Sequence, residues 1–194
     1  MATTTTISQV GEFPLISSMV GDLTMGQAVT LGPGDDGAVF QVDGSAVVST
    51  DVLVEEVHFR RRWSTATDVG RKAVAVNVSD IEAMGAVPVA LVVGFSAPGD
   101  LPASWAREFM AGMTAESQKA GVSVVGGDTT GGPVVSIAVT VIGQTAGMAP
   151  VRRDGAVPGD EVAVIGQLGL AAAGLALLGR GFRSPRAVVA AQRC

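Results

Sequence analysis

The sequence has one cysteine, one histidine and no tyrosine among its 194 residues. Because the only cysteine is Cys194, the chain can form neither an internal disulfide nor a cysteine-based zinc site. Aromatic residues make up 4% of the sequence, which argues against a base-stacking surface for nucleic acid. The formal net charge of −5 also argues against non-specific nucleic-acid binding and against a basic membrane-surface patch. An anionic ligand would therefore need an attraction other than the overall charge.

Long hydrophobic runs are also scarce. We expect no secretory signal, because residues 1–16 lack a basic region followed by a long apolar one. Residues 162–179 come nearest to a membrane span, but Gly166, Gln167 and Gly169 interrupt them early. This stretch predicts a strand, a glycine turn and a small-residue helix. We therefore expect a soluble cytoplasmic protein with neither a nucleic-acid nor a membrane partner.

What the sequence does have is a large apolar content, 47% hydrophobic against 16% charged residues, so a sizeable core is available. Two β-rich runs flank Asp43-Gly44 and predict a hairpin. Helical spacing and cap signals predict one helix from Thr67 or Asp68 to Gly85. A second helix is predicted to end at Gly121, with Trp105, Phe109 and Met113 as an apolar stripe that belongs to the core. Further strands are predicted at residues 89–95, 122–127, 133–144 and 161–166.

This order of elements predicts an α+β fold with a mixed, mainly antiparallel sheet and helices on one face. We expect an N-terminal domain at residues 1–150. Residues 151–194 would then be the start of an incomplete C-terminal domain.

The stretch LGPGDDGAVF matches the dinucleotide-binding pattern G-x-G-x-x-G at Gly32, Gly34 and Gly37. That pattern requires a strand before the glycines and a helix directly after them, yet here strand-like sequence follows. Asp35 and Asp36 would also repel a pyrophosphate. The dinucleotide interpretation therefore fails on context, and the two carboxylates become the feature to explain.

Three further aspartates each follow an apolar run: Asp51 in AVVSTD, Asp80 in AVNVSD and Asp128 in VVGGD. Carboxylates that converge need a cation to neutralise them. Together with the hydroxyl groups beside them, they form the hard-oxygen ligand set that Mg²⁺ prefers, often together with substrate phosphates. Taken singly, each aspartate is also a common turn residue or helix cap.

Two other polar features have a structural and a functional interpretation. His58, in VEEVHF, is typical of a surface or strand-edge side chain. Arg152-Arg153 is typical of a solvated basic pair, but arginine is also a suitable partner for triphosphate oxygens.

Taken in order, GEFPLI, GPGDDGAVF, STDVLVEEVHF, DVGRKAVAVNVSDIEAMGA and VVGGDTTGG resemble the thiamine-monophosphate kinase family, from Gly11 to Gly179. The resemblance implies transfer of the γ-phosphoryl group of ATP to thiamine monophosphate, with several Mg²⁺ ions. It also implies a homodimer and an N-terminal domain of the aminoimidazole-ribonucleotide synthetase type.

The resemblance assigns roles to individual residues. His58 would lie beside the thiamine phosphate, and Gly127, Asp128 and Arg153 would bind ATP, with Arg152 as the alternative to Arg153. The metal ligands implied by the motifs are Asp36, Ser49, Thr50, Asp51, Asp80 and Asp128. No catalytic residue separate from these ligands is implied, because the attacking phosphate oxygen is already anionic.

The family's second domain, with its acidic V-S-D-G motif, has no counterpart in these residues. Two alternatives stay open. One is another ATP-dependent enzyme of the superfamily, of the hydrogenase-maturation type; the selenophosphate-forming type needs a reactive N-terminal Cys or selenocysteine, which is absent. The other is a non-catalytic dimerising domain that binds metal or nucleotide.

Overall fold

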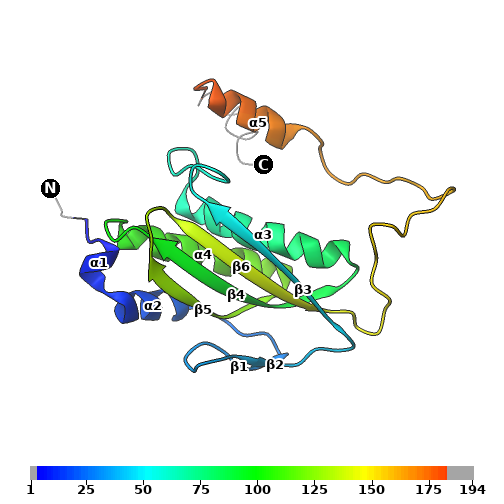
Figure 1. The fold of residues 1–194 in the computed structure, drawn as a ribbon, viewed down its shortest axis with the longest axis horizontal. Helices are drawn as coiled ribbons and strands as arrows, with labels where there is room; N and C mark the ends of the chain where they lie inside the picture. Colours follow the sequence, from blue (N-terminus) through cyan, green and yellow to red (C-terminus); the bar gives the residue numbers. More distant parts are fainter. Residues whose placement is uncertain (1–3, 183–194) are drawn as a thin grey trace. The chain divides into compact units, whose positions relative to one another are not determined.

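The computed structural model describes residues 4–182 and divides the chain into two compact units, one up to Arg152 and one from Arg153 (Figure 1). All strands of the structure lie in the first unit. The predicted N-terminal domain at 1–150 and the predicted start of a C-terminal domain at 151–194 remain predictions.

A four-stranded sheet forms the centre of the first unit, in the order β3-β6-β4-β5 (Figure 1). β6 pairs antiparallel with both β3 and β4, and β4 pairs parallel with β5. The sheet is thus mixed and mainly antiparallel, and the predicted α+β fold is confirmed. The strands are β3 (Ala46–Val54), β4 (Val87–Ala97), β5 (Ser123–Gly131) and β6 (Ser136–Gln144).

Two long helices, α3 (Ala66–Ala83) and α4 (Ala103–Ala120), cover one face of this sheet. The start of α3 lies slightly earlier than predicted: Thr65 is its N-cap and forms a capping box with Asp68. Gly85 follows its end with φ +69°, and Gly121 ends α4 with φ +69°, both as predicted.

The core between helices and sheet is aliphatic with one aromatic cluster. Phe109 and Met113 of α4 are fully buried, and Trp105 stacks between Phe59, Phe95 and Phe109. The predicted apolar stripe of α4 is therefore core. α3 and α4 also approach closely, because a β-carbon built on Gly70 would meet the Phe109 carbonyl and lie 2.8 Å from the Met113 nitrogen.

The predicted hairpin around Asp43-Gly44 is wrong. β2 (Val39–Phe40) pairs with β1 (Val29–Leu31), and β3 pairs with β6, nearly one hundred residues further along the chain. Asp43-Gly44 instead packs against the turn after β6, where the Asp43 carbonyl accepts the Ala146 N–H at 3.0 Å. The long-range strand pairing overrides the local turn signal here.

The sheet face away from α3 and α4, called the open face below, is only partly covered. A small cluster at one end joins Val89, Ala90 and Val125 to residues of β1 and β2. Beyond it, Val48 and Val52 of β3 stay 61% and 46% exposed. The other helices of this unit, α1 (Ile7–Val10) and α2 (Glu12–Val20), precede β1, and α2 packs against α4.

The second unit contains α5 (Leu170–Gly179), the helix expected from the Ala/Leu-rich sequence. The predicted strand at 161–166 is wrong: these residues have no regular structure, and Val162 and Ile165 are fully exposed. A strand needs a neighbour for its N–H and C=O groups, and the described residues of this unit provide none. Within 4–182, no helix has the length and apolar character to cross a membrane.

Candidate functional site

Three of the predicted metal ligands come together where β3 faces α3. The Ser49 hydroxyl donates to the Asp80 carboxylate at 2.8 Å, and the Asp51 N–H donates to Asn77 Oδ1 at 3.2 Å. Asn77 in turn donates its Nδ2 to the Ala73 carbonyl at 2.9 Å. Ser49 is half-buried, while Asp51 and Asp80 are exposed. We call Ser49, Asp51, Asn77 and Asp80 the β3–α3 cluster.

The cluster follows from two periodicities. Alternate residues of a strand face the same side, so Ser49 and Asp51 share the α3 side of β3 with the buried Leu53. Residues three apart on a helix also share a face, which brings Asn77 and Asp80 to β3. Asp51 and Asp80 lie near the ends of β3 and α3, which continue to Val54 and Ala83.

Asn77 has a role that the sequence pattern did not reveal. It is 0% exposed although it is polar, and its amide bridges the backbone of α3 to the backbone of β3. A buried amide is costly unless it is hydrogen-bonded, so these two contacts hold it and the strand together. The signal in the sequence was a polar residue at a core position of AVAVNVSD.

The side chain of Thr50 points to the open face. Its hydroxyl donates to the Val139 carbonyl at 3.0 Å and lies 3.2 Å from the Thr140 hydroxyl. Within this chain, the structure therefore does not bring the Thr50 side chain to Ser49 and Asp51. The predicted ligand run Ser49-Thr50-Asp51 is divided between the two faces of the sheet.

Gly127 and Asp128 lie on β5, at the opposite edge of the sheet from β3. Three strand spacings separate β5 from β3, about 14 Å. Asp128 follows the apolar residues of β5, which continues to Gly131. Asp128 is in register with Gly94, which places it on the open face. A side chain at Gly127 would collide with the Val93 carbonyl.

Asp36 lies in the turn between β1 and β2. Its N–H donates to the Asp35 carboxylate at 2.9 Å, and Gly34 takes φ +127°. The Asp35 side chain thus makes a hydrogen bond within the turn, and both aspartates are exposed. The choice of Asp36 over Asp35 as the ligand remains a prediction.

His58 lies in the loop after β3, and its Nδ1 accepts the Val54 N–H at 3.0 Å. It is exposed, as expected for a strand-edge residue. Arg153 is exposed and belongs to the second unit. The substrate role of His58 and the ATP role of Arg153 stay predictions.

The donors of the β3–α3 cluster fit a hard cation such as Mg²⁺. Within 4–182, no three His, Cys, Asp or Glu side chains gather as an all-protein metal site would require. Mg²⁺ is usually held by one or two carboxylates together with water and substrate phosphates. Asp51 and Asp80 match that pattern.

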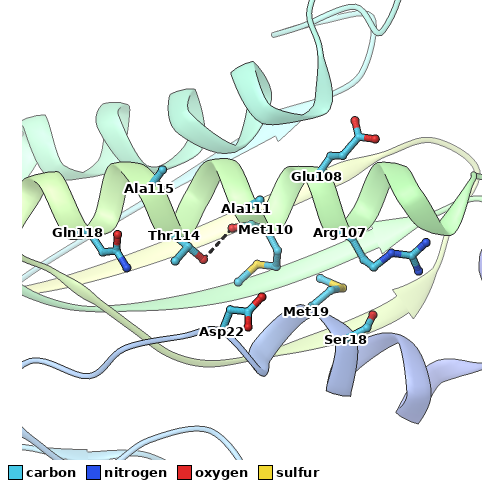
Figure 2. A pocket seen from close by; sticks show the side chains of 10 residues that line it. All are labelled: Ser18, Met19, Asp22, Arg107, Glu108, Met110, Ala111, Thr114, Ala115 and Gln118. Atoms are coloured by element: carbon cyan, nitrogen blue, oxygen red, sulfur yellow. Dashed lines mark hydrogen bonds between the residues drawn. The ribbon is translucent and has the colours of Figure 1, made fainter.

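A surface depression between α2 and α4 is lined by none of the predicted site residues (Figure 2). Figure 2 shows Met19 and Asp22 opposite Arg107 and Thr114 of α4, with the Thr114 hydroxyl bonded to the Met110 carbonyl at 2.9 Å. The polar side chains here carry both signs of charge. Because none of the residues of the β3–α3 cluster lines it, the depression is separate from that cluster.

Residues 34–145, from the turn that carries Asp36 to the residue after β6, match the family model of the AIR synthase related protein, N-terminal domain. The chain therefore belongs to this family.

Within the family, the chain is similar to thiamine-monophosphate kinases, which confirms the resemblance of the motifs. It is 49% identical over 173 residues to the thiamine-monophosphate kinase of Mycobacterium tuberculosis, covering 89% of this chain and 52% of the relative. The chain thus spans about half the length of the curated relatives it matches.

Solved structures support the same similarity to thiamine-monophosphate kinases. AaThiL complexed with AMPPCP and TMP aligns with a TM-score of 0.72 and 31% identity, covering 99% of this chain and 60% of that one. Hydrogenase maturation protein HypE in complex with ATP aligns less well, with a TM-score of 0.57 and 26% identity over 72% of this chain and 43% of that one.

Proposed function

We propose that this chain is part of an enzyme that phosphorylates thiamine monophosphate to thiamine diphosphate with ATP, in the cytoplasm. The observation that carries the proposal is the β3–α3 cluster: two motifs of the kinase resemblance, STD and NVSD, are brought into contact by Ser49 and Asp80. The 49% identity to a named thiamine-monophosphate kinase and the likeness to AaThiL with AMPPCP and TMP support the same reaction.

The reaction we propose is direct in-line transfer between two phosphate groups. The terminal oxygen of the monophosphate is anionic near neutral pH, so the chain needs no general base. Mg²⁺ would neutralise the repulsion between the two polyanions. Asp51 and Asp80 would hold this ion, and Ser49 would orient the Asp80 carboxylate through its hydrogen bond. Their work is positioning and charge compensation.

We place ATP near β5 in this proposal, with Gly127, Asp128 and Arg153 as its contacts. Asp128 faces the small residue Gly94 on the neighbouring strand β4, so no large side chain of β4 stands opposite it. Asp36 and Asp128 would supply further oxygen ligands for Mg²⁺, and so would Thr50, from the open face.

We further propose that the chain forms a homodimer through its open face. Two observations support this. The face exposes Val48, Val52 and Val92 beside threonines and small residues, and such a face favours burial against another surface. The ligands on β3 and β5 are also about 14 Å apart within one chain. In a two-fold dimer, β5 of one copy can approach β3 of the other.

Val52→Asp should convert the dimer to a monomer, because a carboxylate replaces an apolar side chain at the centre of the proposed interface. Analytical ultracentrifugation measures the change in mass. Val57→Asp is the matched control: Val57 is 74% exposed in the loop after β3 and should leave the dimer intact. A wild-type chain that sediments as a monomer, or a dimeric Val52→Asp variant, contradicts the proposal.

The reaction itself is tested by incubating the chain with Mg·ATP and thiamine monophosphate and measuring thiamine diphosphate and ADP in equal amounts. Turnover supports the kinase assignment. Turnover by a longer chain only would leave this one as a dimerising domain that binds metal or nucleotide. ATP cleavage without thiamine diphosphate would favour a hydrogenase-maturation type of enzyme, the less similar relative.

A further inference from the structure

Asn77 is a polar residue on the buried face of α3. The other buried residues of this helix are alanine, valine, isoleucine or glycine, and Asn77 is 0% exposed among them. Its Nδ2 donates to the Ala73 carbonyl at 2.9 Å, and its Oδ1 accepts the Asp51 N–H at 3.2 Å. An apolar side chain of similar size would fill the same space without the cost of burying an amide. The amide therefore needs a reason other than packing.

Neither backbone group that Asn77 binds depends on this side chain alone. The helical carbonyl lies four residues before Asn77 and also accepts its N–H in the regular α-helical pattern. Asp51 is in register with Val139 of β6. Glu55 gives its N–H to the Val135 carbonyl at 2.9 Å, and because every second N–H of a strand points the same way, the Asp51 N–H faces β6 as well. Satisfying the backbone is therefore not a sufficient reason for the amide either.

Two neighbouring contacts join α3 to β3. The Ser49 hydroxyl donates to the Asp80 carboxylate at 2.8 Å, and the Asp51 N–H donates to Asn77. Ser49 and Asp51 are two residues apart on one face of the strand, while Asn77 and Asp80 are three residues apart on one face of the helix. Asp80 uses its carboxylate in this contact, whereas Asp51 uses its backbone. The Asn77 contact thus fixes the base of the Asp51 side chain without occupying its carboxylate oxygens.

A cation held between Asp51 and Asp80 requires a fixed distance between their carboxylates. Mg²⁺ prefers a near-ideal octahedron with oxygen ligands at about 2.0–2.1 Å. β3 is an edge strand that pairs only with β6, so the sheet holds it on one side. A displacement of β3 against α3 would change the distance between the two carboxylates. The Asn77 amide resists this displacement, because it binds the backbone of both elements.

We propose that Asn77 is a positioning residue for the cation: its amide holds the Asp51 backbone against α3, so that Asp51 and Asp80 bind one divalent ion. The inference rests on the proposed function, in which these two aspartates hold Mg²⁺. It adds a residue that contacts no ligand itself and gives that residue an effect on metal affinity. Residues that orient a metal ligand through a hydrogen bond typically change metal affinity by about 10- to 100-fold.

Two substitutions of Asn77 test the proposal. Asn77→Leu keeps the size of the side chain and removes both hydrogen bonds. Asn77→Ser keeps a hydroxyl for the carbonyl four residues earlier but is too short to reach the Asp51 N–H. We expect both variants to bind Mn²⁺, a paramagnetic substitute for Mg²⁺, about 10- to 100-fold more weakly than the wild-type chain. Electron paramagnetic resonance of free Mn²⁺ during a titration gives the dissociation constants, and unchanged constants overturn the proposal.

Leu15→Ala separates positioning from a general effect on stability. Leu15 is fully buried on α2, which packs against α4 and carries none of the predicted ligands. This variant should lower the temperature of unfolding at least as much as Asn77→Ser, because it leaves a cavity in the core, yet it should bind Mn²⁺ like the wild-type chain. If Mn²⁺ affinity falls in both variants in proportion to the lost stability, Asn77 only stabilises the fold and the positioning role is wrong.

A double variant tests whether Asn77 acts through Asp51. Once Asp51→Asn has removed the carboxylate, the further change Asn77→Ser should cause no additional loss of Mn²⁺ affinity. Losses that add up show that Asn77 acts by another route and contradict the proposal. A wild-type chain that binds no Mn²⁺ refutes both the metal site of the proposed function and this inference. Wild-type binding that Asn77→Ser leaves unchanged refutes the inference alone.

Discussion

Asp51→Asn should lower the rate of thiamine diphosphate formation by about 10²- to 10³-fold, the usual cost of removing one electrostatic contact to a reacting group. Asp51 offers its carboxylate to the cation, and its backbone N–H, not its side chain, binds Asn77. The substitution therefore removes a metal ligand and keeps the hydrogen bond that holds the strand. Enzyme kinetics at saturating Mg·ATP measures the effect.

The free energy of unfolding should stay the same in this variant, because the hydrogen bond from the Asp51 N–H to Asn77 is kept. Asp43→Asn, the same change at an exposed position before β3, is the control and should leave the rate unchanged. If the chain shows no turnover, Mg²⁺-dependent nucleotide binding is compared in the same variants. If Asp51→Asn forms thiamine diphosphate at the wild-type rate, the assignment of Asp51 as a metal ligand is wrong. If the variant unfolds without metal, the carboxylate has a structural role.

Gly70→Ala should destabilise the fold by about 2–3 kcal/mol, in the upper part of the range typical of overpacked cores. Its β-carbon would meet backbone atoms of α4 at Phe109 and Met113, which cannot rotate away as a side chain can. The helices would have to separate. Alanine's better helix propensity, about 1 kcal/mol, offsets only part of this cost. Urea denaturation followed by circular dichroism gives the difference.

Gly131→Ala is the matched control, because a β-carbon at Gly131 meets no atom within 4 Å. This variant should be neutral or slightly more stable, since alanine restricts the unfolded chain. If the two alanine variants unfold at the same denaturant concentration, the close contact of α3 and α4 is not what stabilises the unit.

The sequence predicts α4 and the core stripe of Phe109 and Met113 well, because helix periodicity and caps are local signals. It fails at Asp43-Gly44 and at residues 161–166, where strand formation depends on a distant partner or on the lack of one. The spacing of Asp51 and Asp128 along the chain also gives no indication of their places at opposite edges of the sheet. Sheet order is a property of the tertiary structure, and it decides which of the predicted ligands meet.

One helix, α3, contacts both the loop of His58, the predicted substrate residue, and the predicted metal ligands of β3. Lys72 holds the loop of His58, Asn77 holds the backbone of Asp51, and Asp80 binds Ser49. A slip of α3 by one residue would move all three by about 1.5 Å along its axis and about 100° around it. The substrate-side and metal-side contacts would then be lost together. Substitutions that disturb the packing of α3 against α4 should therefore reduce the affinity for the substrate and the affinity for Mg²⁺ in parallel.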